Sequence, residues 1–250
     1  MQKLSALQVT IVVLLLCLTN AATAAELRLV ISSGRAPYVY AETKSGVEYE
    51  IIETVVKKMG YELKPIFVPS ARLPLMLKEK DVDGVVNSTR ATGDGLFYSD
   101  PHIEYYNCYI TLAERNLDLK KLDDIKGLSL AGFADARIYL GPEFKAATTK
   151  AKKYIEYGQQ LSQIKLLLGK RVDVVIADRY IFNYNLEKAI RQGSPSLPVK
   201  YHHVFPPHVH GYGILFKDKT VRDNFNIALG QIKKDGTYKN LLKKYHIETH

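Results

Sequence analysis

Residues 77–90 read LKEKDVDGVVNSTR, and residues 168–179 read LGKRVDVVIADR. Both stretches pass from the end of an apolar helix through a basic turn into a Val-Asp pair, a short apolar run and a polar tip. A continuous apolar run bounded by turn residues is typical of a parallel strand that is buried on both faces. Each stretch therefore predicts one helix, turn and strand, and the pair predicts two similar α/β sheets.

Polar residues follow both predicted strands. They are Asn87 to Arg90 in the first stretch, and Asp178 with Arg179 in the second. Open α/β sheets bind ligands at the carboxyl ends of their strands. Either tip alone is explained by the ordinary polar residues between a strand and a helix. Two matching tips in one chain favour two lobes that face a shared cleft.

The first 24 residues have the features of a cleaved signal peptide. Lys3 provides a positive start, Val9 to Leu18 is apolar, and Ala22-Thr23-Ala24 fits a small-residue cleavage site. A membrane-spanning helix needs roughly 20 apolar residues, so this run is too short to be a permanent anchor. We therefore expect an exported, periplasmic protein whose mature chain begins after residue 24.

Composition limits the partners and the chemistry. The net charge is +9, which favours an anionic ligand or an anionic envelope surface, although a merely basic surface also explains it. We expect no nucleic-acid partner, because the charges are dispersed and no recognition motif is present. Cys108 is the one cysteine of the predicted mature chain, so no internal disulfide forms, and we expect a monomer. The sequence contains no hydrolase or nucleotide-binding motif, and its histidines lack ligand partners at metal-site spacing; we expect no cofactor and no metal.

Two extended segments are suited to connect the lobes. Residues 105–113 form a continuous run that is long enough to cross from one lobe to the other, and residues 208–216 fit a return crossing. These crossings predict a first lobe built from residues 25–112 and 212–250. They predict a second lobe built from residues 113–211.

Several short fragments resemble, in the same order, those of the extracellular solute-binding proteins of family 3, the polar amino-acid type that serves ATP-driven importers. The fragments are Pro37-Tyr38, Asp81-Val82-Asp83, Tyr98-Ser99-Asp100-Pro101, Leu122-Asp123-Asp124-Ile125-Lys126-Gly127, Arg171-Val172-Asp173-Val174-Val175, His210-Gly211-Tyr212-Gly213 and Lys234-Asp235-Gly236-Thr237. The likeness covers nearly the whole mature chain. It implies an α/β, two-lobed periplasmic binding protein fold of type II, in which two crossing strands join lobes that close on a small ligand. It also implies an inner-membrane ABC permease or a receptor as partner.

The resemblance assigns roles to particular residues. Tyr38 takes the position of an aromatic wall, and Asn87, Ser88 and Thr89 lie where the first lobe offers hydroxyls and carbonyls. Asp178 matches the carboxylate that holds a ligand's amino group. Its alternative role is to cap the helix that begins near Tyr180.

The chain also departs from the family pattern. The arginine that usually takes the ligand's carboxylate is missing, and Gly95 falls near its place. Arg72, Arg90 and Arg137 are the alternatives for this guanidinium, whereas we expect Arg35 to be a solvated loop charge. The usual second-lobe Gly-Ser/Thr pair is replaced by Phe133-Ala134-Asp135, a loop that opens onto a helix whose N–H groups attract anions. We include Phe133 among the residues predicted to contact the ligand.

We therefore predict a periplasmic solute-binding protein, not an enzyme. It captures a small charged or zwitterionic solute, an amino acid or a related molecule, in a cleft between the lobes for ABC-type import. Two alternatives remain open at this point. One is a ligand sensor that docks on a membrane signalling protein, and the other is a dehydratase-like enzyme on the same fold.

Overall fold

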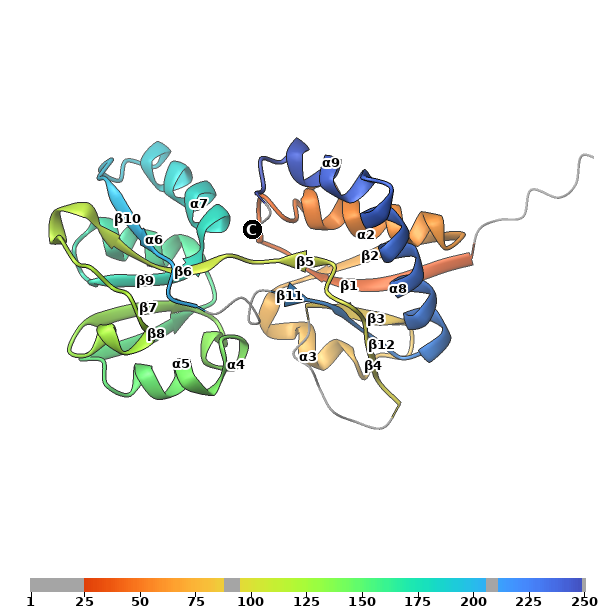
Figure 1. Ribbon diagram of the computed structural model, residues 1–250, viewed down its shortest axis with the longest axis horizontal. Helices are drawn as coiled ribbons and strands as arrows, with labels where there is room; N and C mark the ends of the chain where they lie inside the picture. Colours follow the sequence, from red (N-terminus) through yellow and green to blue (C-terminus); the bar gives the residue numbers. More distant parts are fainter. Residues whose placement is uncertain (1–24, 88–94, 206–210, 249–250) are drawn as a thin grey trace, which may run out of the picture.

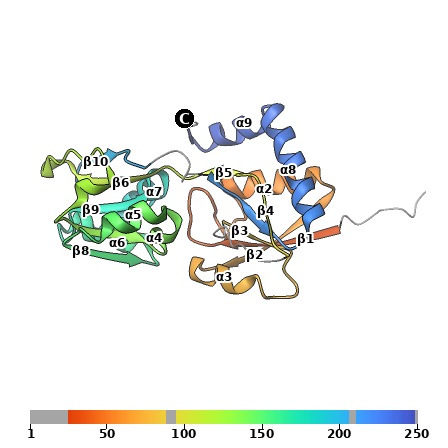
Figure 2. The ribbon, with the colours of Figure 1, turned by 60° about the horizontal axis from the view of Figure 1, so that its bottom comes forward.

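Two α/β lobes lie side by side, connected by extended strands (Figures 1 and 2). The structure is a computed structural model that describes residues 25–87, 95–205 and 211–248. The predicted signal peptide and three predicted site residues, Ser88, Thr89 and Arg90, lie outside the described residues.

The first lobe is built on a five-stranded sheet. Its order is β2 (Tyr61–Val68), β1 (Ala25–Ser32), β3 (Gly84–Val86), β12 (Ile214–Phe216) and β4 (Phe97–Tyr98). Helices α2 (Val47–Lys58), α8 (Lys219–Lys234) and α9 (Thr237–Lys244) pack their apolar faces on one side of this sheet. The short helices η1 (Ser70–Arg72) and α3 (Leu73–Met76) lie on the other side, where Leu73 packs against Val30 and Val85.

The second lobe contains a sheet of the same size. Its order is β8 (Lys153–Tyr157), β7 (Ser129–Phe133), β9 (Val174–Asp178), β6 (Asn107–Leu112) and β10 (Val199–His202). Helices α6 (Gln160–Leu168) and α7 (Arg179–Arg191) cover one face. Helices α4 (Ala136–Tyr139) and α5 (Gly141–Thr148), with the short helix η3 (Leu122–Ile125), cover the other. A further short helix, η2 (Ala113–Arg115), follows β6.

The two sheets share one topology. In the first sheet, β1 lies between two parallel neighbours, β2 and β3, and in the second sheet β7 lies between two parallel neighbours, β8 and β9. Two further strands, each antiparallel to the one before it, extend each sheet on one side: β12 and β4 in the first, β6 and β10 in the second. Strands β3 and β9, which lie within the two matching stretches of sequence, occupy equivalent places. The expectation of two similar sheets is therefore confirmed.

The repeated aspartate before these strands has a structural role. The Asp83 carboxylate accepts a hydrogen bond from the backbone N–H of Arg28 at 2.6 Å, and the Asp173 carboxylate accepts one from Ser129 at 2.8 Å. The backbone N–H of each aspartate in turn donates to the carbonyl of the same partner, at 2.9 and 2.8 Å. In both lobes the aspartate thus fixes the central strand against its neighbour, which explains why the same local sequence occurs twice.

The first crossing lies earlier in the chain than the sequence predicted. Strand β5 (Ile103–Glu104) pairs with β11 (Gly211–Tyr212), and β6 already belongs to the second sheet. The chain therefore changes lobe at Tyr105 and Tyr106, and the predicted first-lobe limit at residue 112 is corrected to a point before residue 107. A strand that is buried throughout, as β6 is, looks the same in sequence as a connecting run. Within the described parts of the chain, every helix is too short or too polar to span a bilayer.

Substitution of Asp173 tests the role of the repeated aspartate. Asp173→Ala leaves the Ser129 N–H and hydroxyl without their acceptor and removes the 2.8 Å ion pair with Arg115. We expect a loss of about 1–3 kcal/mol in the free energy of unfolding, measured by urea denaturation. Asp118→Ala is the control, because its ion pair with Lys120 is fully exposed and should contribute much less. Equal losses in the two variants would contradict this role.

Candidate functional site

A cavity lies between the two lobes. The space between the atoms here is about 620 Å³, counting the part that opens to solvent. Both lobes and the first crossing contribute to its walls. The lining residues are Arg35, Ser70, Tyr105, Asn107, Phe133, Ala134, Asp135, Tyr139, Tyr157, Gly158, Gln160, Asp178, Ile181 and Tyr212.

Arg35 provides the cationic group of this cavity. The backbone N–H groups of Tyr38 and Val39 donate to the Arg35 carbonyl at 2.8 and 3.2 Å, so the loop after β1 folds back on itself. The guanidinium lies 3.5 Å from the Tyr105 hydroxyl, and its carbon lies 5.7 Å from the centre of the Tyr105 ring. Among the described residues that line the cavity, Arg35 is the only lysine or arginine. The expectation that Arg35 is a solvated loop charge is therefore wrong.

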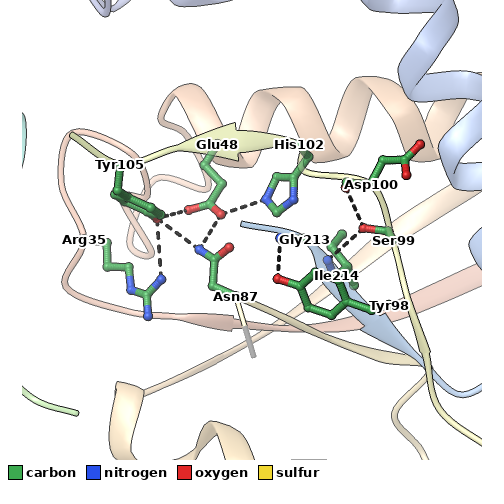
Figure 3. Close-up of polar contacts among 10 residues, drawn as sticks. All are labelled: Arg35, Glu48, Asn87, Tyr98, Ser99, Asp100, His102, Tyr105, Gly213 and Ile214. Carbon is green, nitrogen blue, oxygen red and sulfur yellow. Dashed lines mark hydrogen bonds and ion pairs between the residues drawn. The ribbon is translucent and has the colours of Figure 1, made fainter. Parts of the chain in front are cut away.

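A buried carboxylate, Glu48 of α2, supports Arg35 through the Tyr105 hydroxyl (Figure 3). It accepts hydrogen bonds from the Asn87 amide at 2.6 Å and from the Tyr105 hydroxyl at 2.5 Å, and it lies 2.8 Å from His102 Nε2. Burial alone would raise the pKa of Glu48. The hydrogen bonds from His102 and Tyr105 and the charge of Arg35 outweigh burial, and the pKa is lowered. Glu48 is thus ionised at neutral pH and orients Tyr105, the residue that accepts from Arg35.

Gly46 allows α2 to begin against the Arg35 loop. Its φ is +112°, in the region that favours glycine, and a Cβ there would lie 2.4 Å from the Tyr38 carbonyl oxygen. That carbonyl accepts the backbone N–H of Glu48 at 3.0 Å. The close approach places the first turn of α2, and with it Glu48, directly beside the loop that carries Arg35.

Asp178 lines the cavity, but its carboxylate is fully engaged within the protein. One oxygen accepts the N–H groups of Tyr180 and Ile181, both at 2.9 Å, and caps α7. The other oxygen accepts the Tyr106 N–H at 2.6 Å and the Tyr38 hydroxyl at 3.0 Å. Burial raises the pKa of Asp178 to about 6, and these hydrogen bonds act in the opposite direction. A carboxylate has about four acceptor sites, so all are used, and the helix-cap interpretation is confirmed.

The remaining predicted residues of the first lobe are packed rather than open. Tyr38 is fully buried, with its ring centre 4.4 Å from that of Tyr105. The side-chain amide of Asn87 donates to Glu48. The backbone carbonyl of Asn87 accepts a hydrogen bond at 3.1 Å from the hydroxyl of Tyr139, a residue of the second lobe. With the bond from Tyr38 to Asp178, side chains of each lobe thus contact the other lobe beside the cavity.

The structure shows where the predicted second-lobe residues and the alternative arginines lie relative to the cavity. Phe133 lines the cavity, and its contact with a ligand stays a prediction. Arg72 is exposed, outside the lining. Arg137 stacks 4.5 Å from the centre of the Tyr154 ring and donates to Thr148 at 2.9 Å, which holds it away from the cavity. Neither arginine therefore supplies the guanidinium of this cavity, and the third alternative, Arg90, lies outside the described residues.

The second-lobe loop that was expected to attract an anion is already occupied. The Glu156 carboxylate accepts the N–H of Asp135 at 2.9 Å and the N–H of Arg137 at 3.1 Å. These are the N–H groups at the start of α4 that would otherwise face an anion. These two N–H groups are therefore not available to an anionic ligand.

A family comparison agrees with the fold and the cavity. The model of the bacterial extracellular solute-binding proteins, family 3, matches residues 27–248. The chain belongs to this family. Members of the family bind solutes outside the cytoplasm, so this chain is a solute-binding protein of the periplasm or the extracellular space.

Three similar proteins illustrate the relationship. A probable amino-acid-binding protein of Bacillus subtilis (strain 168), YxeM, is 26% identical over 221 residues, which are 85% of this chain and 80% of the relative. An ancestral arginine-binding protein solved with glutamine has a TM-score of 0.69 at 21% identity, with 90% of this chain and 99% of that chain covered. A histidine kinase sensor domain similar to periplasmic binding proteins has a TM-score of 0.71 at 16% identity, with 89% and 96% covered. The solved structures confirm the two-lobed, type II periplasmic binding protein fold.

Sequence reasoning missed Arg35, although the sequence carries a signal for it. Arg35 follows directly on the first strand, at the edge where ligands bind in open α/β sheets. Gly34 and Pro37, on either side of it, mark a sharp turn. An arginine in a tight turn at that edge is placed to face a cleft.

Replacement of Tyr38 tests the hydrogen bonding of Asp178. Tyr38→Phe removes a donor that favours the ionised carboxylate, so we expect the pKa of Asp178 to rise above about 6. A ¹³C NMR titration of the Asp178 carboxyl measures this pKa directly. Tyr40→Phe is the matched control, because Tyr40 packs on Tyr184 instead and should leave the pKa unchanged. A fall in the pKa after Tyr38→Phe would show that the hydroxyl does not donate to Asp178.

The same pKa has a consequence for stability. The folded chain holds the Asp178 proton more tightly than the unfolded chain, in which the pKa is about 3.9. The contribution of Asp178 to stability is therefore fully present below about pH 4 and is lost as the pH rises through about 6.

Proposed function

We propose that this protein captures a small charged or zwitterionic solute of the amino-acid type in the cavity between its lobes. The observation that carries the proposal is the position of Arg35. It lines the cavity and forms no ion pair within 4 Å with any carboxylate of the described residues. Glu48 acts on this cation through space and through Tyr105 without a direct ion pair, so the guanidinium can still receive an anionic group of a ligand. The naming of the Bacillus subtilis relative as a probable amino-acid-binding protein supports this class of solute.

The contacts in the cavity are sufficient for useful affinity. A charge-assisted hydrogen bond contributes roughly 1.5–3 kcal/mol, and a guanidinium can offer two to one carboxylate. The cavity also presents the rings of Tyr105, Tyr139, Tyr157 and Tyr212, against which the body of a solute can pack. After the cost of ordering the ligand, a binding free energy of about −8 kcal/mol, or micromolar affinity, is expected.

Delivery to a membrane importer completes the proposed role. Residues 1–24 act as a cleaved signal peptide that releases the chain into the periplasm, where it works as a monomer. The loaded protein then docks on an inner-membrane ABC permease. The family match and the apolar start of the chain support this role.

A sensor is the second candidate function. The similarity to a histidine kinase sensor domain, with a TM-score of 0.71, favours it, because that protein uses the same fold. A dehydratase-like activity has weaker support. The two buried carboxylates beside the cavity, Glu48 and Asp178, accept hydrogen bonds from protein donors. They are therefore less available to act as a general acid or base.

Isothermal titration with ligand-free protein tests the proposed function. The panel comprises the twenty L-amino acids, the polyamines putrescine and spermidine, and the carboxylates succinate and citrate. We expect micromolar binding of at least one member and a loss of tenfold or more in Arg35→Gln. Arg72→Gln removes a similar charge outside the cavity and should bind as the wild type does. Absence of saturable heat for every member, or unchanged affinity in Arg35→Gln, would contradict the proposal.

A further inference from the structure

We infer that Asp135, rather than Asp178, receives the cationic group of the solute. A zwitterionic ligand then lies with its carboxylate on Arg35 of the first lobe and its α-ammonium group on Asp135 of the second. This inference rests on the proposed function and names the class of solute more closely: a molecule that carries both charges. It moves the cation-binding role to a residue at which the family resemblance assigns no carboxylate.

Asp178 is poorly suited to a ligand cation, because its acceptor sites serve the fold. The donors are three backbone N–H groups, of Tyr106, Tyr180 and Ile181, and the hydroxyl of Tyr38. An ammonium group would have to displace one of them. Loss of a backbone donor would uncap α7 or release the crossing, and loss of the Tyr38 hydroxyl would break a contact between the lobes.

Asp135 has the opposite character. It lines the cavity, it is exposed, and within the described residues its carboxylate has no hydrogen bond or ion pair. Its backbone N–H is bound by Glu156, which fixes the start of the loop without using the Asp135 side chain. Its φ of +61° is in the left-handed region, which aspartate and asparagine tolerate better than most residues. The carboxylate is therefore held at the cavity and is available to a ligand.

The charges around the cavity are divided between the lobes. Arg35 is the one lysine or arginine among the described lining residues, and it belongs to the first lobe. The described lining of the second lobe contains Asp135 and Asp178 and no basic residue. Glu156 neutralises the N–H groups at the start of α4, so this wall does not attract an anion there.

Tyr139 lies under the influence of both opposite charges. Burial raises the pKa of the Tyr139 hydroxyl, the positive charge of Arg35 lowers it, and the negative charge of Asp135 raises it. Arg35 and Asp135 form no ion pair with each other within 4 Å, yet both act on one hydroxyl. A solute beside Tyr139 would thus lie near both a cation and an anion.

Two amide groups at the cavity also have few protein partners. Within the described residues, the Gln160 oxygen has no hydrogen bond, and the amide nitrogen of Asn107, a residue that is 4% exposed, has only the Tyr212 hydroxyl near it. Burial raises the pKa of that hydroxyl, and the Asn107 amide lowers it. Buried polar groups are almost always paired in folded proteins, so an unpaired one calls for an explanation. A polar solute in the cavity supplies both partners: an acceptor for Asn107 and a donor for Gln160.

The test uses three probes on the full-length mature protein. They are the tightest-binding of the twenty L-amino acids, its 2-hydroxy acid, which lacks the ammonium group, and its decarboxylated amine. Titration with wild-type protein should give at least tenfold weaker binding for each truncated probe. Asp135→Asn retains a residue that accepts the left-handed backbone, so the variant is expected to fold.

The variants should separate the two ends of the solute. Asp135→Asn should weaken binding of the amino acid at least tenfold and leave the affinity for the 2-hydroxy acid unchanged. Arg35→Gln should weaken binding of the amino acid and leave the affinity for the amine unchanged. Glu143→Gln, an equal charge change in the second lobe outside the cavity lining, should alter none of the three affinities.

The outcomes distinguish this inference from the proposed function. If Asp135→Asn binds the amino acid as tightly as the wild type, or loses affinity equally for the 2-hydroxy acid, Asp135 does not receive the cation and the inference is overturned. In that case Arg35→Gln can still lose affinity, and the proposed function stands. If no amino acid binds but a succinate, citrate or polyamine titration does, the zwitterion is overturned while solute binding stands. If nothing binds, both proposals fail.

Discussion

Burial of one ionised carboxylate constrains the first-lobe half of the cleft. A buried charge costs several kcal/mol unless hydrogen bonds and an opposite charge compensate for it. Glu48 obtains both: Asn87, His102 and Tyr105 surround it, and Arg35 adds its positive charge. These partners come from the end of β3, the segment before β5, the crossing and the loop after β1 (Figure 3). The requirement to satisfy Glu48 therefore brings four separate segments to one place and sets the position of Arg35.

Asp178 does for the second lobe what Glu48 does for the first. Tyr105 and Tyr106 are adjacent residues at the crossing, and each is held by a buried carboxylate, Tyr105 through its hydroxyl by Glu48 and Tyr106 through its N–H by Asp178. The crossing thus donates one hydrogen bond to a carboxylate of each lobe. Both carboxylates are used to position the walls of the cavity, which is why we assign recognition of a solute to the less engaged charges of Arg35 and Asp135.

Local sequence was sufficient to predict the paired sheets. The Val-Asp pair, the apolar run and the polar tip are contiguous in the chain, and the contact that each aspartate makes, with the strand beside it, recurs in both lobes. The helix cap at Asp178 was likewise visible as an alternative, because capping involves only the next three residues. The matching polar tips and the two extended segments already favoured two lobes, and the family resemblance added the type II fold.

Features that depend on contacts distant in the chain were harder to predict. Arg35 faces inward because the loop after β1 folds on α2 through the close approach at Gly46, and the sequence does not show which side of the loop is covered. Arg137 turns away because Tyr154 and Thr148 receive it, and neither is its neighbour in sequence. The lobe boundary was misplaced because a strand buried on both faces has the same composition as a buried connection. The free carboxylate of Asp135 could be recognised only once Glu156 was seen to occupy the adjacent N–H groups.

A crystal structure of the protein with the solute that co-purifies with it tests the central claim most directly. The claim predicts an anionic group of that solute within about 3 Å of the Arg35 guanidinium, inside the cavity between the lobes. An anionic group held by another residue, with Arg35 bonded only to the protein or turned to solvent, would contradict it.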